Sequence, residues 1–203
     1  MHRSLSPVEF DVVSVPPRFE RAQVVLRLVL MLVLAHIGTT LGSLFWLLYL
    51  VLPVAAAVLV SQHGAARYVA EDSSRVVRLL QWAIAVYAYL LLLTDRFPTS
   101  ASDPAVRFEV RPEGEPTAGS ALWRLVTTLP MAIALALLGI VSTICWFFAN
   151  VLVLVHGEYP RAFYDYQVGV VRWLARLWAY HASLVQTYPP VSFESGREVA
   201  VGG

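Results

Sequence analysis

The chain has 203 residues and a formal net charge of +1, and it is 58% hydrophobic and 14% charged. Soluble domains usually carry about a quarter of charged residues, so this composition disfavours an ordinary soluble fold. The nearly balanced charge gives no indication of nucleic acid as a partner.

Two long segments without Asp, Glu, Lys or Arg dominate the chain. Residues 28–60 and 125–155 form runs of 33 and 31 residues, well beyond the roughly 18 that mark a membrane-spanning candidate. A third charge-free run covers residues 79–94. These runs predict an all-α integral membrane protein of the cell (inner or plasma) membrane.

The first half of the chain divides into three predicted elements. Residues 7–13 alternate apolar and charged side chains, which predicts a half-buried strand. The first apolar run predicts a long helix over 25–62. A second helix is predicted over 74–95, ending before Phe97-Pro98, because proline disfavours continuation of a helix.

The second half has the same order of elements. A linker over 101–121 contains another alternating segment, which predicts a strand over 105–111. A long apolar helix is then predicted over 122–156. A further helix over 164–187 ends at a second aromatic–proline pair.

Matching landmarks in the two halves indicate a tandem duplication of a unit of roughly 95 residues. We assign residues 1–100 to the first repeat, 122–195 to the second and 196–203 to a C-terminal tail. The matched pairs are Arg27 and Arg124, Gly42 and Gly139, His63 and His156, Trp82 and Trp173, Tyr89 and Tyr180, and Phe97 and Tyr188.

The length of each apolar run limits the number of membrane crossings. A helix of 33 residues would extend about 50 Å, against a hydrocarbon core of about 30 Å. A run of this length is too long for one upright crossing, and it is too short for two crossings of about 20 residues each with a turn between them. We expect one tilted or kinked crossing per run, with a break at Pro130, and therefore two crossings per repeat and four in all. The alternative is a helical hairpin with its turn near 38–43 and 139–142.

An even number of crossings per repeat would place the predicted strands on one side of the membrane. The strands at 7–13 and 105–111, with further alternating segments at 191–194 and 198–201, would then form a small β-strand module outside the membrane. This side carries more of the arginines than the other. The positive-inside rule therefore predicts that it is cytoplasmic, with the N- and C-termini.

Several segments resemble a known family. H-G-E-Y-P-R-A-F-Y-D-Y (156–166), G-V-V-R-W-L-A-R-L-W-A-Y (169–180) and Y-P-P-V-S-F (188–193) are similar to the bacterial membrane proteins of the domain of unknown function 4389. L-L-L-T-D-R-F-P (91–98) and A-V-R-F-E-V (105–110) resemble its other recurrent pieces. Gln81 and Ala85 stand where the pattern has arginine, and Val185-Gln186 where it has threonine and aspartate. The resemblance implies the membrane fold and no activity.

The candidate lipid- or partner-binding residues lie in the last predicted helix. Arg172 and Arg176 are four residues apart and share a helix face beside Trp173, with Asp165 two turns earlier. Charges inside a membrane are costly, so they suggest a functional site. The alternatives are arginines that reach lipid headgroups without a specific site, or an ion or substrate path. Four aromatic residues are predicted to anchor the helices at the membrane interface: Tyr89, Phe97, Tyr180 and Tyr188.

The histidines do not form a metal or catalytic pattern. His36 and His181 are expected to hydrogen-bond to neighbouring helices rather than relay protons. His63 and His156 each precede a glycine, which favours a helix C-cap with the glycine in the left-handed conformation. We recognise no catalytic motif, no metal site and no cofactor motif in the sequence.

Three classes of function remain. The first is an accessory or scaffolding protein that binds membrane lipids, another membrane protein or a second copy of itself. The alternative is a small repeat-built transporter or channel for ions or small solutes, since transporters often contain repeats. The third is a membrane enzyme acting on lipid, with Asp165, His156 and His181 as its polar residues.

Overall fold

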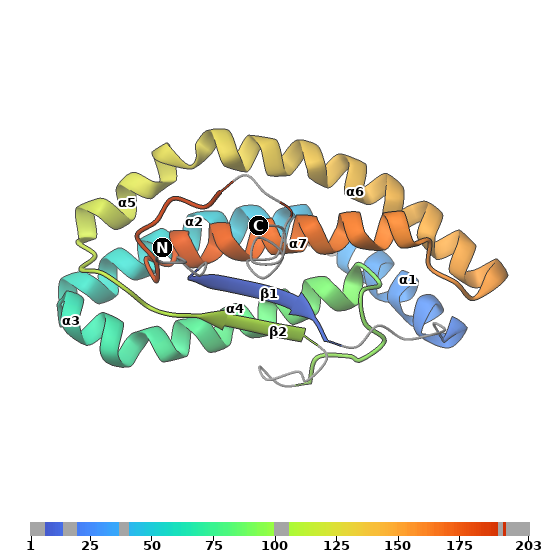
Figure 1. The fold of residues 1–203 in the computed structure, drawn as a ribbon, viewed down its shortest axis with the longest axis horizontal. Coiled ribbons are helices and arrows are strands. Elements are labelled where there is room, and N and C mark those ends of the chain that lie inside the picture. Colours follow the sequence, from blue (N-terminus) through green and yellow to red (C-terminus); the bar gives the residue numbers. More distant parts are fainter. Residues whose placement is uncertain (1–6, 14–19, 37–40, 100–105, 191–192, 194–203) are drawn as a thin grey trace, which may run out of the picture.

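The computed structural model of the protein describes residues 7–13, 20–36, 41–99, 106–190 and 193. The chain is mostly helical with one two-stranded sheet (Figure 1). Its elements are β1 (Val8–Val12), α1 (Arg21–His36), α2 (Leu41–His63), α3 (Ala65–Arg67), the π-helical turn η1 (Tyr68–Asp72), α4 (Ser73–Leu90), β2 (Val106–Val110), α5 (Ala118–Thr127), α6 (Leu129–His156) and α7 (Arg161–His181).

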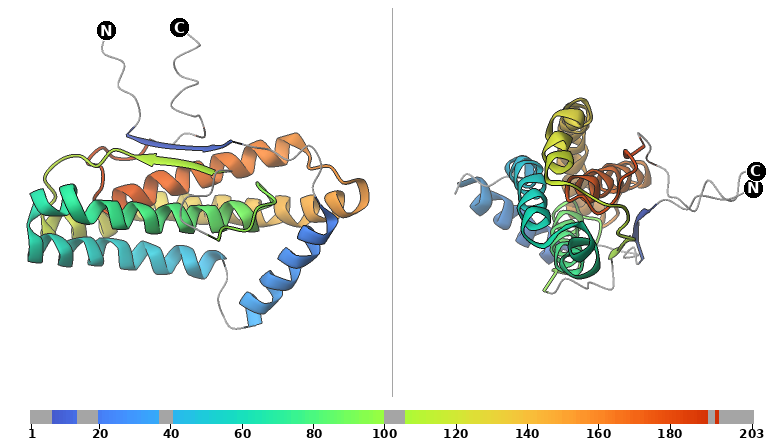
Figure 2. Two further views of the ribbon diagram at one scale, coloured as in Figure 1. Left: turned by 90° about the horizontal axis from the view of Figure 1, so that it is seen from below. Right: turned by 90° about the vertical axis from the view of Figure 1, so that its left-hand side faces the viewer.

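The helices form a bundle that carries the sheet on one side. α4 and α7 pack against each other in opposite directions, and the two strands lie on their outer side (Figure 2). α2 packs against α5, and α6 packs against α7. Both α2 and α6 lie away from the sheet. α1 diverges from the bundle and contacts α6. The main core lies where these layers meet and contains the fully buried Trp178.

The structure describes two helices within each predicted long apolar helix. α1 and α2 lie in the range predicted as one helix over 25–62, with residues 37–40 outside the described part, and α5 and α6 replace the helix predicted over 122–156. Pro130 lies in the first turn of α6. The backbone N–H groups of a first turn have no partner within the helix, so the missing N–H of proline costs nothing there, while its ring prevents α5 from continuing. α6 runs unbroken through Gly139, so the alternative hairpin turn at 139–142 is wrong.

The helices predicted over 74–95 and 164–187 end earlier than expected, at Leu90 and His181. In each, a residue with positive φ, Leu92 at 65° and Ser183 at 54°, turns the chain out of the helix. The amide of the next residue then donates to a carbonyl five residues back, over 2.8 Å in the first case and 3.1 Å in the second. This hydrogen bond caps the helix end, so the aromatic–proline pairs lie beyond the caps and do not stop the helices.

The predicted strands at 7–13 and 105–111 form β1 and β2, which pair antiparallel with Phe10 opposite Phe108. Both phenylalanines are buried against the helices, as the alternating pattern predicts. The further strand segments predicted at 191–194 and 198–201 lie outside the described residues, apart from Phe193.

The sheet lies along the sides of the helices rather than beyond their ends. The Gln81 amide, in the middle of α4, donates to the Phe108 carbonyl over 3.1 Å, and the Arg172 guanidinium, in the middle of α7, donates to the Phe10 carbonyl over 3.2 Å. The predicted small strand module is therefore present as a two-stranded sheet on one side of the helices. The alternating patterns predict strands but carry no information about which part of the helices they cover.

Candidate functional site

Arg172 binds β1 through its side chain. Besides the Phe10 carbonyl, its guanidinium donates to the carbonyl of Phe193 and lies 3.8 Å from the carboxylate of Asp11. Its side chain is 11% exposed. Its hydrogen-bonding capacity is therefore largely used within the protein, and it holds the strand against α7.

The first half of the chain has a glutamine in the matching position. Gln81 holds Phe108 of β2 on α4 as Arg172 holds Phe10 of β1 on α7. Glutamine can replace arginine here because the task is a neutral hydrogen bond to a backbone carbonyl. The departure from the family pattern at this position therefore keeps the contact with the strand.

The other predicted site residues are not gathered at one accessible place. Arg176 and Trp173 are 5% and 3% exposed, and the Trp173 ring packs edge-on against Phe193. Asp165 is exposed and makes no ion pair with any described residue. Two of the four predicted members are thus buried and a third binds a strand, and the predicted role of the cluster in lipid or partner binding stays a prediction.

Tyr89, predicted as an interface anchor, is buried beneath an arginine. The Arg27 guanidinium stacks 4.4 Å from the centre of the Tyr89 ring and donates to the Thr94 carbonyl. It also forms a 2.8 Å ion pair with Asp95. The exposed Phe97 ring packs edge-on against Tyr89, with 5.3 Å between ring centres. Tyr89 thus stabilises a buried charge.

The second half contains a matching arrangement without the carboxylate. Arg124 stacks 4.1 Å from the centre of the Tyr180 ring and donates to the carbonyls of Tyr180 and Val185. Tyr188, 44% exposed, packs edge-on against Tyr180, which is half-buried. Gln186 stands where Asp95 stands in the first half, and Arg124 has no ion pair among the described residues. Burial lowers the pKa of Arg124.

The sequence reasoning matched these two arginines but missed their role. The available signal was the paired change at Thr94-Asp95 and Val185-Gln186. The first half has an acidic side chain at Asp95, and the second half has none at the matched Gln186. This difference suggests that Asp95 pairs with a basic residue, and the basic residue matched between the halves is the arginine at 27 or 124. Nothing in the sequence indicated that the carbonyls of the helix caps would be the other partners.

The histidines have structural roles where they are described. His181 hydrogen-bonds to Thr128 and to the Tyr49 carbonyl, as expected for a contact with neighbouring helices. His63 lies 2.6 Å from the carboxylate of Asp72. Gly157, after His156, adopts the predicted left-handed cap with φ of 77°. Gly64 has φ of 80° but an extended ψ of 159°, so only one of the two predicted caps has left-handed geometry. The side chain of His36 lies outside the described residues.

The polar residues considered for a lipid-acting enzyme are not brought together. Asp165 lies in the first turns of α7 and His181 is its last residue, so about 24 Å of helix separates them at 1.5 Å per residue. Among the described residues, no three side chains of the metal-ligating types gather in one place.

Large apolar side chains are exposed along α1, α2, α5 and α6, the helices that lie away from the sheet, and we call this surface the apolar face. Its exposed members are Val25, Leu26, Val29, Trp46, Leu47, Leu50, Val51, Val54, Val58, Leu122, Trp123, Val126, Leu129, Ile133, Leu137, Ile140, Val141, Ile144, Phe147, Phe148, Val151 and Val155.

Two helices of the apolar face are long and apolar enough to cross a membrane. They are Gly42–His63 and Leu129–His156, and only 39% and 22% of their most apolar segments are buried inside the protein. A core helix of a soluble protein would be mostly buried. These two helices instead leave more than half of those segments unburied, which suggests a membrane protein.

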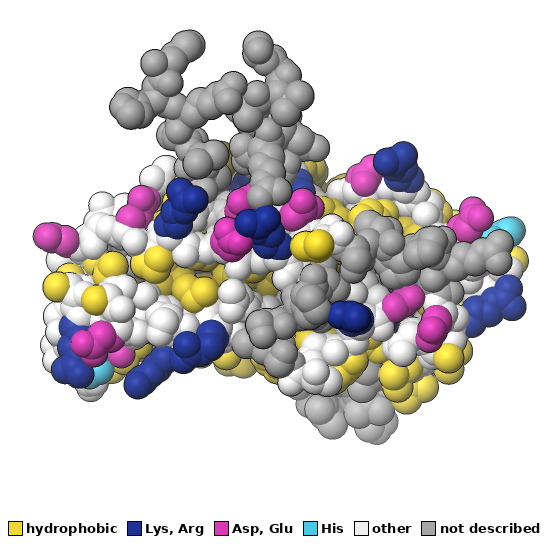
Figure 3. Space-filling view, turned by 60° about the horizontal axis from the view of Figure 1, so that its bottom comes forward, with side chains coloured by type: hydrophobic (Ala, Val, Ile, Leu, Met, Phe, Trp, Pro, Cys, Tyr) yellow, Lys and Arg dark blue, Asp and Glu magenta, His cyan; other side chains and the backbone are white. Residues whose placement is uncertain are grey.

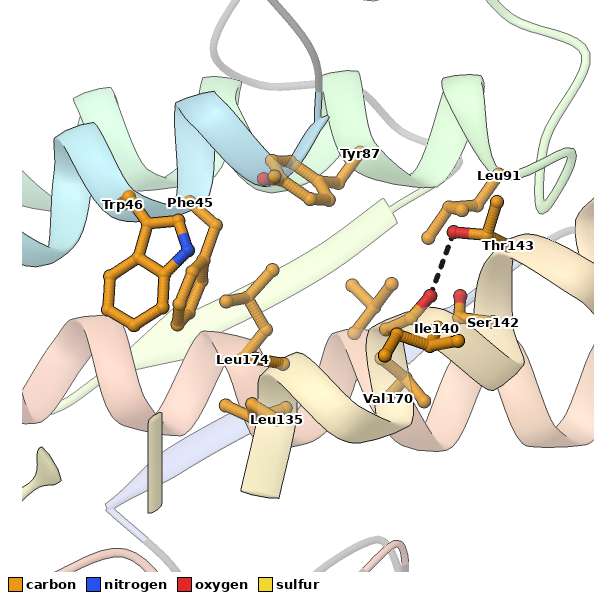
Figure 4. Close-up of a pocket in the computed structure, with 14 residues that line it drawn as sticks. Phe45, Trp46, Tyr87, Leu91, Leu135, Ile140, Ser142, Thr143, Val170 and Leu174 are labelled. Atoms are coloured by element: carbon orange, nitrogen blue, oxygen red, sulfur yellow. Dashed lines mark hydrogen bonds between the residues drawn. The ribbon is translucent and has the colours of Figure 1, made fainter. Parts of the chain in front are cut away.

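A crevice of about 290 Å³ opens between α2 and α6 (Figure 4). α4 and α7 form its floor through buried side chains that include Tyr87, Leu91, Val171 and Leu174. Its rim includes Trp46 and Ile140, which belong to the apolar face. The matched glycines Gly42 and Gly139 both line it.

Comparison with known proteins gives one finding. No curated protein matches the chain, and no solved structure does. Residues 119–192, which cover α6, α7 and most of α5, match the model of the family described as Domain of unknown function (DUF4389). This match supports the resemblance seen in the sequence and assigns no activity to the chain.

Proposed function

We propose that this chain is an integral membrane protein that acts as an accessory or scaffolding component by binding lipid or a partner protein, without catalytic turnover. The apolar face is the observation that carries this proposal. Its exposed residues are contributed by four helices, and α2 and α6 contain no Asp, Glu, Lys or Arg.

Water is a poor solvent for such a face. The largest exposed apolar patch on a soluble monomer covers about 300–600 Å². Here two helices of 23 and 28 residues expose apolar side chains along most of their length. Lipid tails solvate these side chains without the free-energy cost of exposing apolar surface to water. The proposal therefore places the apolar face in the bilayer.

The opposite face has the character of a surface in water or among headgroups. Charged side chains are spread over the face that carries α4 and the strands (Figure 3). They include Arg75, Arg78 and Glu109, all exposed. A two-stranded sheet also has unpaired backbone groups along its edges, which lipid cannot satisfy. The helices then lie along the membrane, and we propose that the sheet face is turned towards the cytoplasm, because arginines outside a membrane are favoured on that side.

The four-crossing arrangement stays a prediction and meets a specific difficulty. If α4 and α7 crossed the bilayer, the sheet against their middles would lie at the depth of the lipid tails. Another protein or a second copy of the chain would have to cover the strand edges. A flat orientation needs no such cover, and we propose it for that reason.

The proposed duplication is supported by matched contacts in the two halves. The same cap ends α4 and α7, the same arginine–tyrosine stack lies beside each cap, and each of these helices holds the central phenylalanine of one strand. β1 precedes α1 but packs on α7, while β2 precedes α5 but packs on α4. The two proposed repeats therefore exchange their strands.

Alkaline extraction of membranes tests the proposal. We expect the full-length chain to stay in the membrane pellet at high pH, because apolar burial holds it and charge does not. A peripheral protein of known behaviour, expressed in the same cells, should be released. Release of this chain into the supernatant would contradict the proposal.

A further inference from the structure

We propose that the crevice between α2 and α6 holds one acyl chain of a membrane phospholipid. This inference rests on the proposed function, because it takes the apolar face to be in contact with lipid. It goes further by naming the ligand class and the place where it binds.

The position of the crevice selects a lipid chain as the occupant. Its rim residues Trp46 and Ile140 are 41% and 61% exposed and belong to the apolar face. In a membrane, the solvent at that rim consists of lipid tails. A tail reaches the floor on α4 and α7 without crossing any polar surface.

The chemistry of the lining favours an alkyl chain over water or a polar ligand. The Ser142 hydroxyl donates to the Gln167 side chain, and the Gln167 amide donates back to the Ser142 carbonyl over 2.7 Å. The Thr143 hydroxyl donates to the Gly139 carbonyl over 2.8 Å. With these groups satisfied, water would find few polar partners in the crevice, and apolar cavities of this kind stay dry or bind apolar molecules.

The size of the crevice follows from missing side chains. A β-carbon built on Gly139 would have no atom within 4 Å, so the helix backbone borders open space there. The volume of about 290 Å³ is roughly ten times the share of one water in the liquid, about 30 Å³. That leaves room for several methylenes of one chain.

Binding of a lipid tail in the crevice is driven by van der Waals contact rather than by the hydrophobic effect. A lipid tail moves from one apolar environment to another, so little is gained from leaving water. Filling the crevice instead adds dispersion contacts between the alkyl chain and the apolar side chains that line it.

Native mass spectrometry of the full-length chain, solubilised from membranes in mild detergent, tests this inference. We expect one phospholipid to be retained by the wild type and retention to fall about tenfold, or about 1.4 kcal/mol, in Gly139→Leu. The leucine side chain would occupy the crevice, and leucine also favours a helix more than glycine does. Ala136→Leu, at another lining position, provides a second filled variant should the first fold poorly.

Gly119→Leu is the matched control, because Gly119 is also helical and also has open space around its β-position. It does not line the crevice, and we expect it to retain lipid like the wild type. Equal retention in both Gly139→Leu and Ala136→Leu, or retention of a free fatty acid in place of phospholipid, would overturn the inference. Alkaline extraction of the same variants separates this from failure of the proposed function, since neither filled variant should leave the membrane.

Discussion

Asp95→Asn is expected to lower the free energy of unfolding by about 3–5 kcal/mol, the usual cost of removing one partner from a buried ion pair. The Arg27 side chain is fully buried, and Asp95 is its ion-pair partner at 2.8 Å. Two of the three guanidinium nitrogens, Nε and one Nη, have no hydrogen-bond partner among the described residues. Asparagine would keep the shape of the side chain and a hydrogen-bond acceptor for Arg27, but the negative charge would be lost. The buried guanidinium would then have only neutral partners among the described residues: that acceptor, the Tyr89 ring and the Thr94 carbonyl.

Chemical unfolding in detergent micelles measures this effect, and the second half of the chain supplies the control. Gln186→Asn places the same residue at the matched, exposed position and shortens the side chain by one methylene without loss of a charge pair, and we expect it to stay within about 0.5 kcal/mol of the wild type. Adding Arg27→Met to Asp95→Asn should restore much of the lost stability, because the uncompensated charge is then gone. An Asp95→Asn variant as stable as Gln186→Asn would contradict the role of the pair.

Leu137→Arg is expected to weaken membrane association by about 3 kcal/mol, close to the cost of arginine near the centre of a membrane helix. Leu137 is 61% exposed on α6 within the apolar face, so a guanidinium there would replace a side chain surrounded by lipid. The measurement is the fraction of protein that remains in the pellet after alkaline extraction.

Leu79→Arg is the matched substitution on the other face. Leu79 is 50% exposed on α4, directly after Arg78 and four residues after Arg75 in the sequence, where we expect water or headgroups to solvate a further arginine. The variant should therefore remain in the membrane like the wild type. The assignment of the two faces is wrong if Leu79→Arg is released as readily as Leu137→Arg.

The sequence predicts the elements of this fold better than their arrangement. Charge-free runs locate the apolar helices, and alternating apolar residues locate both strands, because these patterns reflect burial along one segment. The observed C-terminal ends of α4 and α7 could not be predicted from the sequence. Their caps use Leu92 and Ser183 at positive φ, whereas the residue that signals such a cap in a sequence is glycine.

The site was harder to predict because its partners are distant in the chain. The Arg172 guanidinium binds the Phe10 carbonyl across 162 positions of sequence, and no local pattern connects those residues. A membrane location made an arginine in a helix look like a lipid or substrate site. In the structure, that arginine binds a strand instead. The crevice includes Gly42 and Gly139 in its lining, and sequence patterns mark glycines only as weak helix positions.

Side-specific thiol labelling tests the central claim, that the apolar face lies in the membrane and the rest of the molecule lies on one side. In a Cys145→Ser background, single cysteines would replace Ala66 in α3, Ala162 in α7 and Glu109 in β2, all exposed and the first two at opposite ends of the bundle (Figure 1). We predict that a membrane-impermeant maleimide reaches all three from the same side. Labelling of Ala66 and Ala162 from opposite sides, or of Glu109 from the side opposite to both, would show that the helices cross the bilayer and contradict the account.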